Sequence, residues 1–254
     1  MSEISMKVKD LGISFGGLKA VDHFDLELKK GELVGLIGPN GAGKTTVFNL
    51  LTGVYTPTEG VVYVGDTLVN GKLTHQVVAQ GVARTFQNIR LFKTLSVIDN
   101  VKIAFTKDMK YSLFQAFLHV GSYWKEEAEI DHKARELLAL FKLEDQADTI
   151  AENLPYGQQR KLEIARALAT NMKILLLDEP AAGMNPTETA ELLECINLVR
   201  KRFKISILLI EHDMSLVMNI CERIIVIDYG VTIAKGLPDE IAKDPKVIAA
   251  YLGT

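Results

Sequence analysis

The sequence has 254 residues, of which 48% are hydrophobic and 24% are charged, and its formal net charge is −3. This composition is ordinary for a globular chain with a substantial core, and the slightly acidic balance gives no general attraction to nucleic acid. No apolar run approaches the roughly 20 residues of a membrane span, and the N-terminus lacks a secretory apolar segment. Two cysteines without metal-ligand spacing, Cys195 and Cys221, favour a reduced intracellular protein.

The N-terminal segment predicts antiparallel strands with one solvent-facing side, because apolar and polar residues alternate in MKVKDLGISF and FDLELKK. The next segment, GELVGLIG, is apolar without alternation, which indicates a strand buried on both faces, as in a parallel sheet. A helix is expected from about residue 43 to 51, closed by Gly53. GVVYVGDTLVNG then predicts a further hairpin.

The segment from about residue 88 to 152 is helical in character. After it, KILLLDEP, PTETAELLECINLVRKRF, ISILLIEHD and RIIVIDYGVTIAKG predict a strand, a helix, a strand and a pair of strands, and the C-terminal residues predict one or two short helices. Strands that alternate with helices indicate the α/β class. We expect one domain over residues 1–254, with an antiparallel-β part and a parallel core in 1–87 and 161–254. A helical subdomain is expected in residues 88–160.

GPNGAGKTT, residues 38–46, fits G-x-x-x-x-G-K-[ST] between a buried strand and a helix. Backbone N–H groups of such a loop curl around phosphate oxygens, glycines permit the close approach, and the helix start adds a positive dipole end. Lys44 would bridge the β- and γ-phosphates, the Thr45 hydroxyl would bind Mg²⁺, and Thr46 would hold another phosphate. The alternative is a glycine-rich turn that happens to carry a lysine. The predicted nucleotide-binding residues of this loop are Gly38, Asn40, Gly41, Ala42, Gly43, Lys44, Thr45 and Thr46.

ILLLDEP supplies the carboxylates that a phosphate loop needs. Its apolar run predicts a central strand whose C-terminal end would deliver Asp178 to Mg²⁺. Glu179 would face the γ-phosphate and orient or deprotonate the attacking water. Alone, the pattern would indicate a buried strand followed by two solvated acids. After a phosphate loop it predicts a P-loop NTPase with a RecA-like core.

With these motifs the chain resembles the ATP-binding cassette subunit of ABC transporters over essentially its whole length. Phe15, in ISFGGLKAV, stands where the family stacks an aromatic ring on adenine, with Val21 nearby. Gln87, in ARTFQNIRLF, matches the glutamine that touches Mg²⁺ or water and senses the membrane partner. AAGMNPTE takes the D-loop position, and His212, in LLIEHDM, matches the switch histidine that reaches the γ-phosphate. The resemblance implies ATP and Mg²⁺ as cofactors and ATP hydrolysis as the activity.

Each of these residues has an alternative explanation when it is taken alone. Phe15 alternates with Leu11 and Ile13, a pattern that favours a place in the core. Gln87 would be an ordinary polar loop residue, and His212 a satisfied histidine at the end of a strand. The functional interpretation depends on their occurring together in one order.

NLPYGQQRKLEIARAL contains the helix start that the family uses as its signature, usually Leu-Ser-Gly-Gly-Gln, 21 residues before the acid pair. In the family it caps the γ-phosphate held by a second cassette, packed head to tail. Pro155 stands where serine would donate, and it offers neither hydroxyl nor N–H. Loss of such a hydrogen bond costs about 1.5–3 kcal/mol, so we expect a working but weakened cap. Pro155 can also act as a helix starter. The corresponding residues are Leu154, Pro155, Tyr156, Gly157 and Gln158.

YGQQRKLEIARAL together with AAGMNPTE resembles the larger of the two cassettes of branched-chain amino-acid uptake systems. This implies a second, different cassette as partner, two membrane-spanning permease subunits, an indirect extracytoplasmic solute-binding protein, and a peripheral location at the cytoplasmic face of the membrane. The alternatives are a cassette of another small-solute importer or of a lipopolysaccharide exporter and, more distantly, a soluble ABC-type ATPase in DNA repair or translation. A P-loop GTPase or kinase conflicts with the signature stretch and the D-loop, and no Asn-Lys-x-Asp motif occurs.

The resemblance also implies a groove beside the Q-loop that accepts a short cytoplasmic helix of the permease. Aromatic residues of the helical segment would line this groove or, alternatively, belong to ordinary helical core. These residues are Tyr111, Phe114, Phe117, Tyr123 and Trp124.

Overall fold

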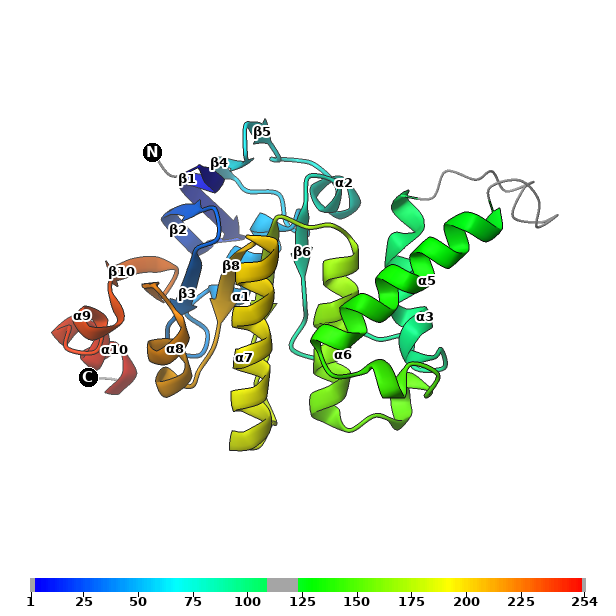
Figure 1. The fold of residues 1–254 in the computed structure, drawn as a ribbon. Helices are drawn as coiled ribbons and strands as arrows, with labels where there is room; N and C mark the ends of the chain where they lie inside the picture. The colour runs from blue at the N-terminus through cyan, green and yellow to red at the C-terminus, as the bar shows by residue number, and fades with distance from the viewer. Residues whose placement is uncertain (1–2, 109–122, 253–254) are drawn as a thin grey trace. The chain divides into compact units, whose positions relative to one another are not determined.

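The computed structural model describes residues 3–108 and 123–252 (Figure 1). They divide into two compact units. The first unit takes its residues from 1–87, 172–182 and 197–254, and the second from 88–171 and 183–196. Three of the aromatic residues assigned to the permease groove, Tyr111, Phe114 and Phe117, lie outside the described residues.

The strands of the described residues all lie in the first unit and form one ten-stranded sheet in the order β5-β4-β1-β2-β10-β9-β3-β8-β7-β6. Strands β1, β2, β4 and β5 pair antiparallel, and β9, β3, β8, β7 and β6 pair parallel. The expected α/β class with an antiparallel part and a parallel core is confirmed. The strands are β1 Ile4–Phe15, β2 Leu18–Lys29, β3 Leu33–Ile37, β4 Glu59–Val64, β5 Thr67–Leu68, β6 Val82–Arg84, β7 Ile174–Asp178, β8 Ser206–Ile210, β9 Arg223–Asp228 and β10 Val231–Gly236.

Burial along the strands follows the two sequence patterns. In β2, Phe24, Leu26 and Leu28 are buried while Asp25 and Glu27 are exposed, so one face of the antiparallel part packs inward. Every residue of β3, β7 and β8 is buried, as expected of parallel strands covered on both faces. The parallel core is therefore fixed in place by uninterrupted apolar burial.

β10 joins the two parts of the sheet. It pairs antiparallel with β9, and it meets β2 through the single parallel pair Val231–Asp22. The Asp22 N–H donates to the Gly230 carbonyl at 2.9 Å. Few backbone hydrogen bonds therefore cross this seam, which the Lys235 ammonium also spans by donating to the Asp25 carbonyl at 2.7 Å.

The helices of the first unit include α1, which begins at Lys44 directly after the glycine-rich loop and ends at Leu51 (Figure 1). This matches the expected helix, and Gly53 follows it with a positive φ of 71°. The short helix α2 and strand β6 were not predicted from the sequence. The other helices of this unit are α2 Thr74–Ala79, α8 Met214–Ile220, α9 Pro238–Ile241 and α10 Pro245–Leu252.

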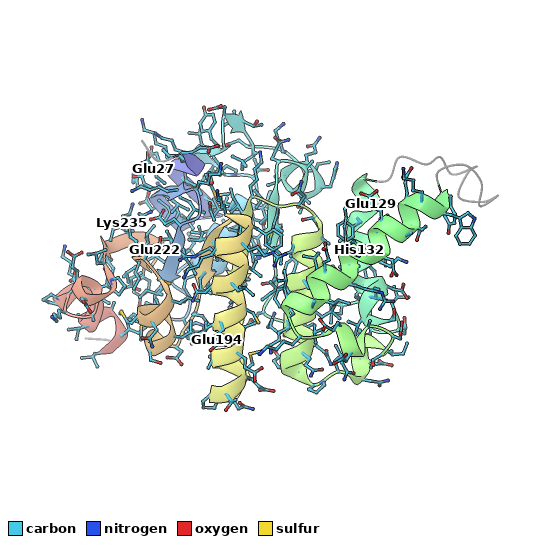
Figure 2. All side chains as sticks on the ribbon, in the orientation of Figure 1. Glu27, Glu129, His132, Glu194, Glu222 and Lys235 are labelled. Carbon is cyan, nitrogen blue, oxygen red and sulfur yellow. The ribbon has the colours of Figure 1, made fainter. Side chains whose placement is uncertain are left out.

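The described part of the second unit is helical, as expected. Helix α5 buries Ile130, Ala134 and Leu137, whereas Glu129 and His132 lie on its exposed face (Figure 2). This division into one apolar and one charged face is typical of a surface helix. The elements of this unit are α3 Val97–Lys102, the 3₁₀ turns η1 Ile103–Asp108, η2 Glu144–Gln146 and η3 Ala151–Asn153, and the helices α5 Tyr123–Leu140 and α6 Tyr156–Ala169.

Helices α6 and α7 place the division of the chain differently from the predicted boundary after residue 160. That boundary falls inside α6, which belongs wholly to the second unit. Helix α7, Pro186–Phe203, begins in the second unit and ends in the first. The end of the signature segment therefore does not mark the boundary, which instead crosses α7 between residues 196 and 197.

Candidate active site

Three motifs follow neighbouring parallel strands. β3, β8 and β7 are adjacent in the sheet and end at nearly the same level, with Leu36 and Asp178 both paired to Ile210. The glycine-rich loop follows β3, the acid pair ends β7, and the His212 segment follows β8. Because the C-terminal ends of parallel strands meet at one edge, the three motifs converge there.

Glycine is required in the phosphate loop by the protein's own packing. A Cβ added to Gly38 would lie 2.0 Å from the Ile227 carbonyl oxygen, and one added to Gly43 would lie 2.8 Å from that of Ala20. Gly43 also has a φ of 104°, in the left-handed region that favours glycine. Ala42 is buried, and its carbonyl accepts the Gly230 N–H at 2.9 Å. The sheet therefore fixes the loop's shape from below.

The Lys44 side chain folds back toward the start of the glycine-rich loop. Its ammonium donates to the carbonyls of Gly38 at 2.6 Å and of Pro39 at 2.8 Å. Burial lowers the pKa of Lys44, and the negative charges of Glu179 and Asp178 oppose that shift. An ammonium has three donors, so one remains for a phosphate oxygen. Thr45, Thr46 and Asn40 are exposed or half-buried on the same loop.

The Asp178 carboxylate is buried and paired with Arg84. One guanidinium nitrogen donates to Asp178 Oδ2 at 2.7 Å, and the other donates to Asn49 Oδ1 at 2.7 Å. The guanidinium also lies over the rings of Phe48 and Phe86, with its central carbon 5.4 and 5.0 Å from their centroids. Arg84 is not among the residues predicted from the sequence. Its signal would have been an arginine at the end of an apolar strand, beside the Gln87 motif.

Glu179 brings two of the other predicted residues together. Gln87 donates from Nε2 to Glu179 Oε2 at 2.6 Å, and the His212 imidazole contacts Oε1 of the same carboxylate. Glu179 is largely buried, with 14% of its side chain exposed, while His212 is 45% exposed. Residues from the ends of β6, β7 and β8 thus meet at one carboxylate.

Phe15 and Val21 lie in the antiparallel part of the sheet. Phe15 ends β1 and is 46% exposed, so the core position favoured by its alternation is wrong. Its ring meets that of Tyr55 edge-on at 5.3 Å between centroids. Val21 is fully buried and pairs with Ile13 across β1 and β2. The exposed face of Phe15 is available for stacking.

The C-terminal helix reaches the phosphate loop, a contact that was not predicted from the sequence. Burial raises the pKa of Tyr251 in α10, and a hydrogen bond with the Gly38 backbone opposes that rise. The first residue of the phosphate loop is thereby linked to a helix near the end of the chain.

The signature segment begins α6 in the second unit. Pro155 occupies the N-cap of α6 and provides no side-chain cap. A proline that starts a helix usually stands one position later, at the first helical residue, which here is Tyr156. Gly157 is buried against Glu188, because an added Cβ would lie 3.1 Å from Glu188 Oε1. The Oε1 atom of Gln158 is buried without a hydrogen-bond partner among the described residues. Leu154 is buried and Tyr156 is exposed. This helix start therefore presents backbone N–H groups without a cap of its own.

The chemistry of the first unit's site suits a magnesium nucleotide. The Thr45 hydroxyl, the Asp178 carboxylate and the Gln87 amide are hard oxygen donors of the kind Mg²⁺ prefers. Within residues 3–108 and 123–252, no group of three or more acidic, histidine or cysteine side chains could hold a metal ion. A glycine-rich loop with its lysine, an acid pair and a histidine at one sheet edge define a P-loop nucleotide hydrolase.

Comparison with known proteins places the chain more narrowly. Residues 21–182 match the family model described as ABC transporter, and residues 231–254 match that of the branched-chain amino acid ATP-binding cassette transporter. The chain is 47% identical over 253 residues to the high-affinity branched-chain amino acid transport ATP-binding protein LivG of Escherichia coli, and 43% identical over 253 residues to BraF of Pseudomonas aeruginosa. Both matches cover 100% of this chain and 99% of the relative.

A solved structure agrees with this placement. MJ1267 in its ADP conformation, an ATP-binding cassette of an ABC transporter, aligns with a TM-score of 0.86 at 31% identity and covers 100% of both chains. The chain therefore belongs to the ABC transporter family. It is one of the family's ATP-binding cassettes, which bind nucleotide and hydrolyse ATP to power transport. In the described part of the chain, no helix combines the length and apolar character that a membrane span requires.

Proposed function

We propose that this chain is the larger ATPase of a branched-chain amino-acid uptake system. It works at the cytoplasmic face of the membrane and pairs head to tail with a second, different cassette. The pair drives two permease subunits, which receive solute from an extracytoplasmic binding protein. Full-length similarity to LivG and BraF, whose names state this transport, supports the assignment. The match of residues 231–254 to the branched-chain cassette model supports it independently.

The proposal depends above all on one observation: Gln87 and His212 both contact the Glu179 carboxylate. The negative charge of Glu179 also acts on the Lys44 ammonium, whose pKa it raises against the effect of burial. Glu179 is the general base: it accepts a proton from the water that attacks the γ-phosphorus. The phosphorus–oxygen bond to ADP then breaks, and ADP and phosphate leave. His212 orients Glu179 and reaches the γ-phosphate.

The remaining residues bind and position the nucleotide. Lys44 and the loop N–H groups hold the β- and γ-phosphates, Thr46 holds another phosphate, and Phe15 stacks on adenine beside Val21. Thr45, Asp178 and Gln87 would hold Mg²⁺, which when bound neutralises charge on the phosphate oxygens. Arg84 keeps the Asp178 carboxylate in its orientation through the 2.7 Å hydrogen bond.

The start of α6 completes the partner's site. Its uncapped N–H groups and helix dipole attract the γ-phosphate of a nucleotide held by the other cassette. Gly157 adds no side chain to this helix start, while Pro155 contributes no donor. Each nucleotide is then enclosed between one phosphate loop and the opposite signature, and ATP binds the closed pair better than the open pair.

A Glu179→Gln variant tests the proposal. Given ATP and magnesium, it should bind nucleotide and retain it, and it should pair more tightly with the second cassette, because the water is no longer activated. Size-exclusion chromatography and counting of bound nucleotide measure both effects. Glu27→Gln, at an exposed position of β2 (Figure 2), is the matched control and should behave as the wild type. A Glu179→Gln protein that neither traps nucleotide nor pairs would refute the assigned role.

A further inference from the structure

Glu211 is a buried acid to which the proposed function gives no role. It follows β8 directly and is only 4% exposed. The pKa of Glu211 is raised, chiefly by burial and also by the negative charge of Glu179. Hydrogen bonds from the backbones of Ala181 and His212 oppose this rise. A carboxylate is held in such a place only where its oxygens find donors.

Each oxygen of Glu211 has a donor of its own. The Ala181 N–H donates to Oε1 at 2.9 Å, and the His212 N–H donates to Oε2 at 3.2 Å. One donor belongs to the turn after β7 and the other to the segment after β8. The carboxylate therefore joins two loops that the sequence separates by 30 residues.

The turn after β7 needs such a restraint. Glu179 has a φ of 46°, in the left-handed region that non-glycine residues seldom adopt. Pro180 follows and has no N–H. The donors on either side of it are both bound to the end of β8: the Glu179 N–H donates to the Ile210 carbonyl at 2.9 Å, and the Ala181 N–H donates to Glu211.

We propose that Glu211 is a positioning residue for ATP hydrolysis. By binding Ala181 and His212 through separate oxygens, it fixes the backbones of both loops, so that the His212 imidazole meets the Glu179 carboxylate. Glu211 does not touch the nucleotide itself. The inference rests on the proposed role of Glu179, and it adds a residue on which the geometry of that base depends.

A Glu211→Gln variant removes one half of this arrangement with almost no change in volume. An amide has one acceptor oxygen and an NH₂ donor, so one of the two backbone N–H groups would face another donor. A misplacement of about 1 Å at a reacting group can cost about 100-fold in rate. The phosphate loop is untouched, so the nucleotide contacts remain.

The experiment compares the steady-state ATPase kinetics of wild-type and variant proteins, each measured in the transporter complex that co-purifies with the full chain. For Glu211→Gln we expect kcat to fall about 10- to 100-fold while the KM for ATP stays within about 2-fold. Glu211→Asp keeps the charge and both acceptors but is shorter, so it should lose less. Glu222→Gln, an exposed acid paired with Arg200 (Figure 2), is the control and should keep the wild-type kcat.

A double-mutant cycle with His212→Ala separates positioning from general weakening of the fold. If Glu211 acts through His212 and Glu179, the combined variant should be little slower than the slower single variant. Fully additive losses, or a Glu211→Gln kcat within about 2-fold of wild type, would overturn the proposal. So would a rise in KM that accounts for the whole loss.

Folding is checked by thermal unfolding and by the affinity for a fluorescent ATP analogue. If Glu211→Gln does not fold, Glu211→Asp decides in its place: a fall in kcat with KM preserved supports the inference, and an unchanged kcat overturns it. An inactive wild-type complex would instead contradict the proposed function. The two failures are thereby distinguishable.

Discussion

The starts of helices α1 and α6, to which we assign phosphate binding, differ in the side chains that they offer. Helix α1 of the first unit and helix α6 of the second both begin without a side-chain cap. α1 opens with the Lys44 ammonium and the hydroxyls of Thr45 and Thr46. The first turn of α6 has no cation, and its one hydroxyl is the phenol of Tyr156. Arg160, which follows that turn, is fully buried, and its guanidinium is paired with the Glu163 carboxylate at 2.8 Å.

The difference indicates how each helix start contributes. α1 combines dipole, N–H groups and charge, so it can hold a nucleotide by itself. α6 offers N–H groups, a dipole and neutral polar side chains but no cation, and such an end attracts an anion weakly unless something else already holds it. We therefore expect nucleotide binding to depend on the first unit, and the second unit to contribute when cassettes pair.

The strongest test of this comparison is Lys44→Ala. It removes the charge from α1 and makes the two helix starts more alike, so kcat should fall about 100- to 1,000-fold, the usual cost of losing a donor that stabilises a transition state. Affinity for a fluorescent ATP analogue should also fall. Lys9→Ala, at an exposed position of β1, is the control. Near-normal binding by Lys44→Ala would show that the α1 start does not depend on its cation.

A second test concerns the interior support of the first unit. Arg84→Ala leaves the buried Asp178 carboxylate and the Asn49 amide oxygen without their shared donor. Breaking a buried ion pair on one side costs about 3–5 kcal/mol in the free energy of unfolding. Urea denaturation at neutral pH measures the change, with the exposed Arg202→Ala as control. A loss below about 1 kcal/mol, the value of exposed pairs, would mean that Asp178 needs no such partner.

The smallest expected effect is that of Pro155→Ser in the second unit. Serine is a strong N-cap residue and restores a hydroxyl, so the α6 start should hold the partner's γ-phosphate better. We expect the ATPase rate of the assembled complex to rise by up to about 10-fold, equivalent to roughly 1.4 kcal/mol. Pro238→Ser, in the first turn of α9, is the control. A large drop in activity would contradict the weakened cap.

Much of the architecture follows from local patterns. The sequence predicts α7 at its observed bounds, Pro186–Phe203, and β7 within KILLLDEP, because periodic or uninterrupted apolar residues decide those elements locally. The convergence of Lys44, Asp178 and His212 is also predictable, since parallel strands end at one edge of a sheet.

Long-range side-chain partners were not predictable. Arg84 is bonded to a carboxylate 94 residues away, and Glu211 to an N–H 30 residues away. Periodicity does not encode which side chains meet at strand ends. Phe15 illustrates the converse: its alternation indicates the core, but β1 ends there and the ring is exposed. The same limit applies to Pro155: its sequence does not decide whether it is the N-cap or the first residue of α6, and the structure places it at the N-cap.

The seam between β2 and β10 would give a nucleotide bound as proposed a mechanical role. Phe15 lies on the antiparallel side of that seam in strand order, and the phosphate loop follows β3 on the parallel side. Only the Val231–Asp22 pair links β10 to β2 along the ladder. A molecule stacked at its base by Phe15 and gripped at its tail by the loop would brace both halves at once. Bound ATP would then stabilise the sheet across this seam, in addition to being the substrate that is hydrolysed there.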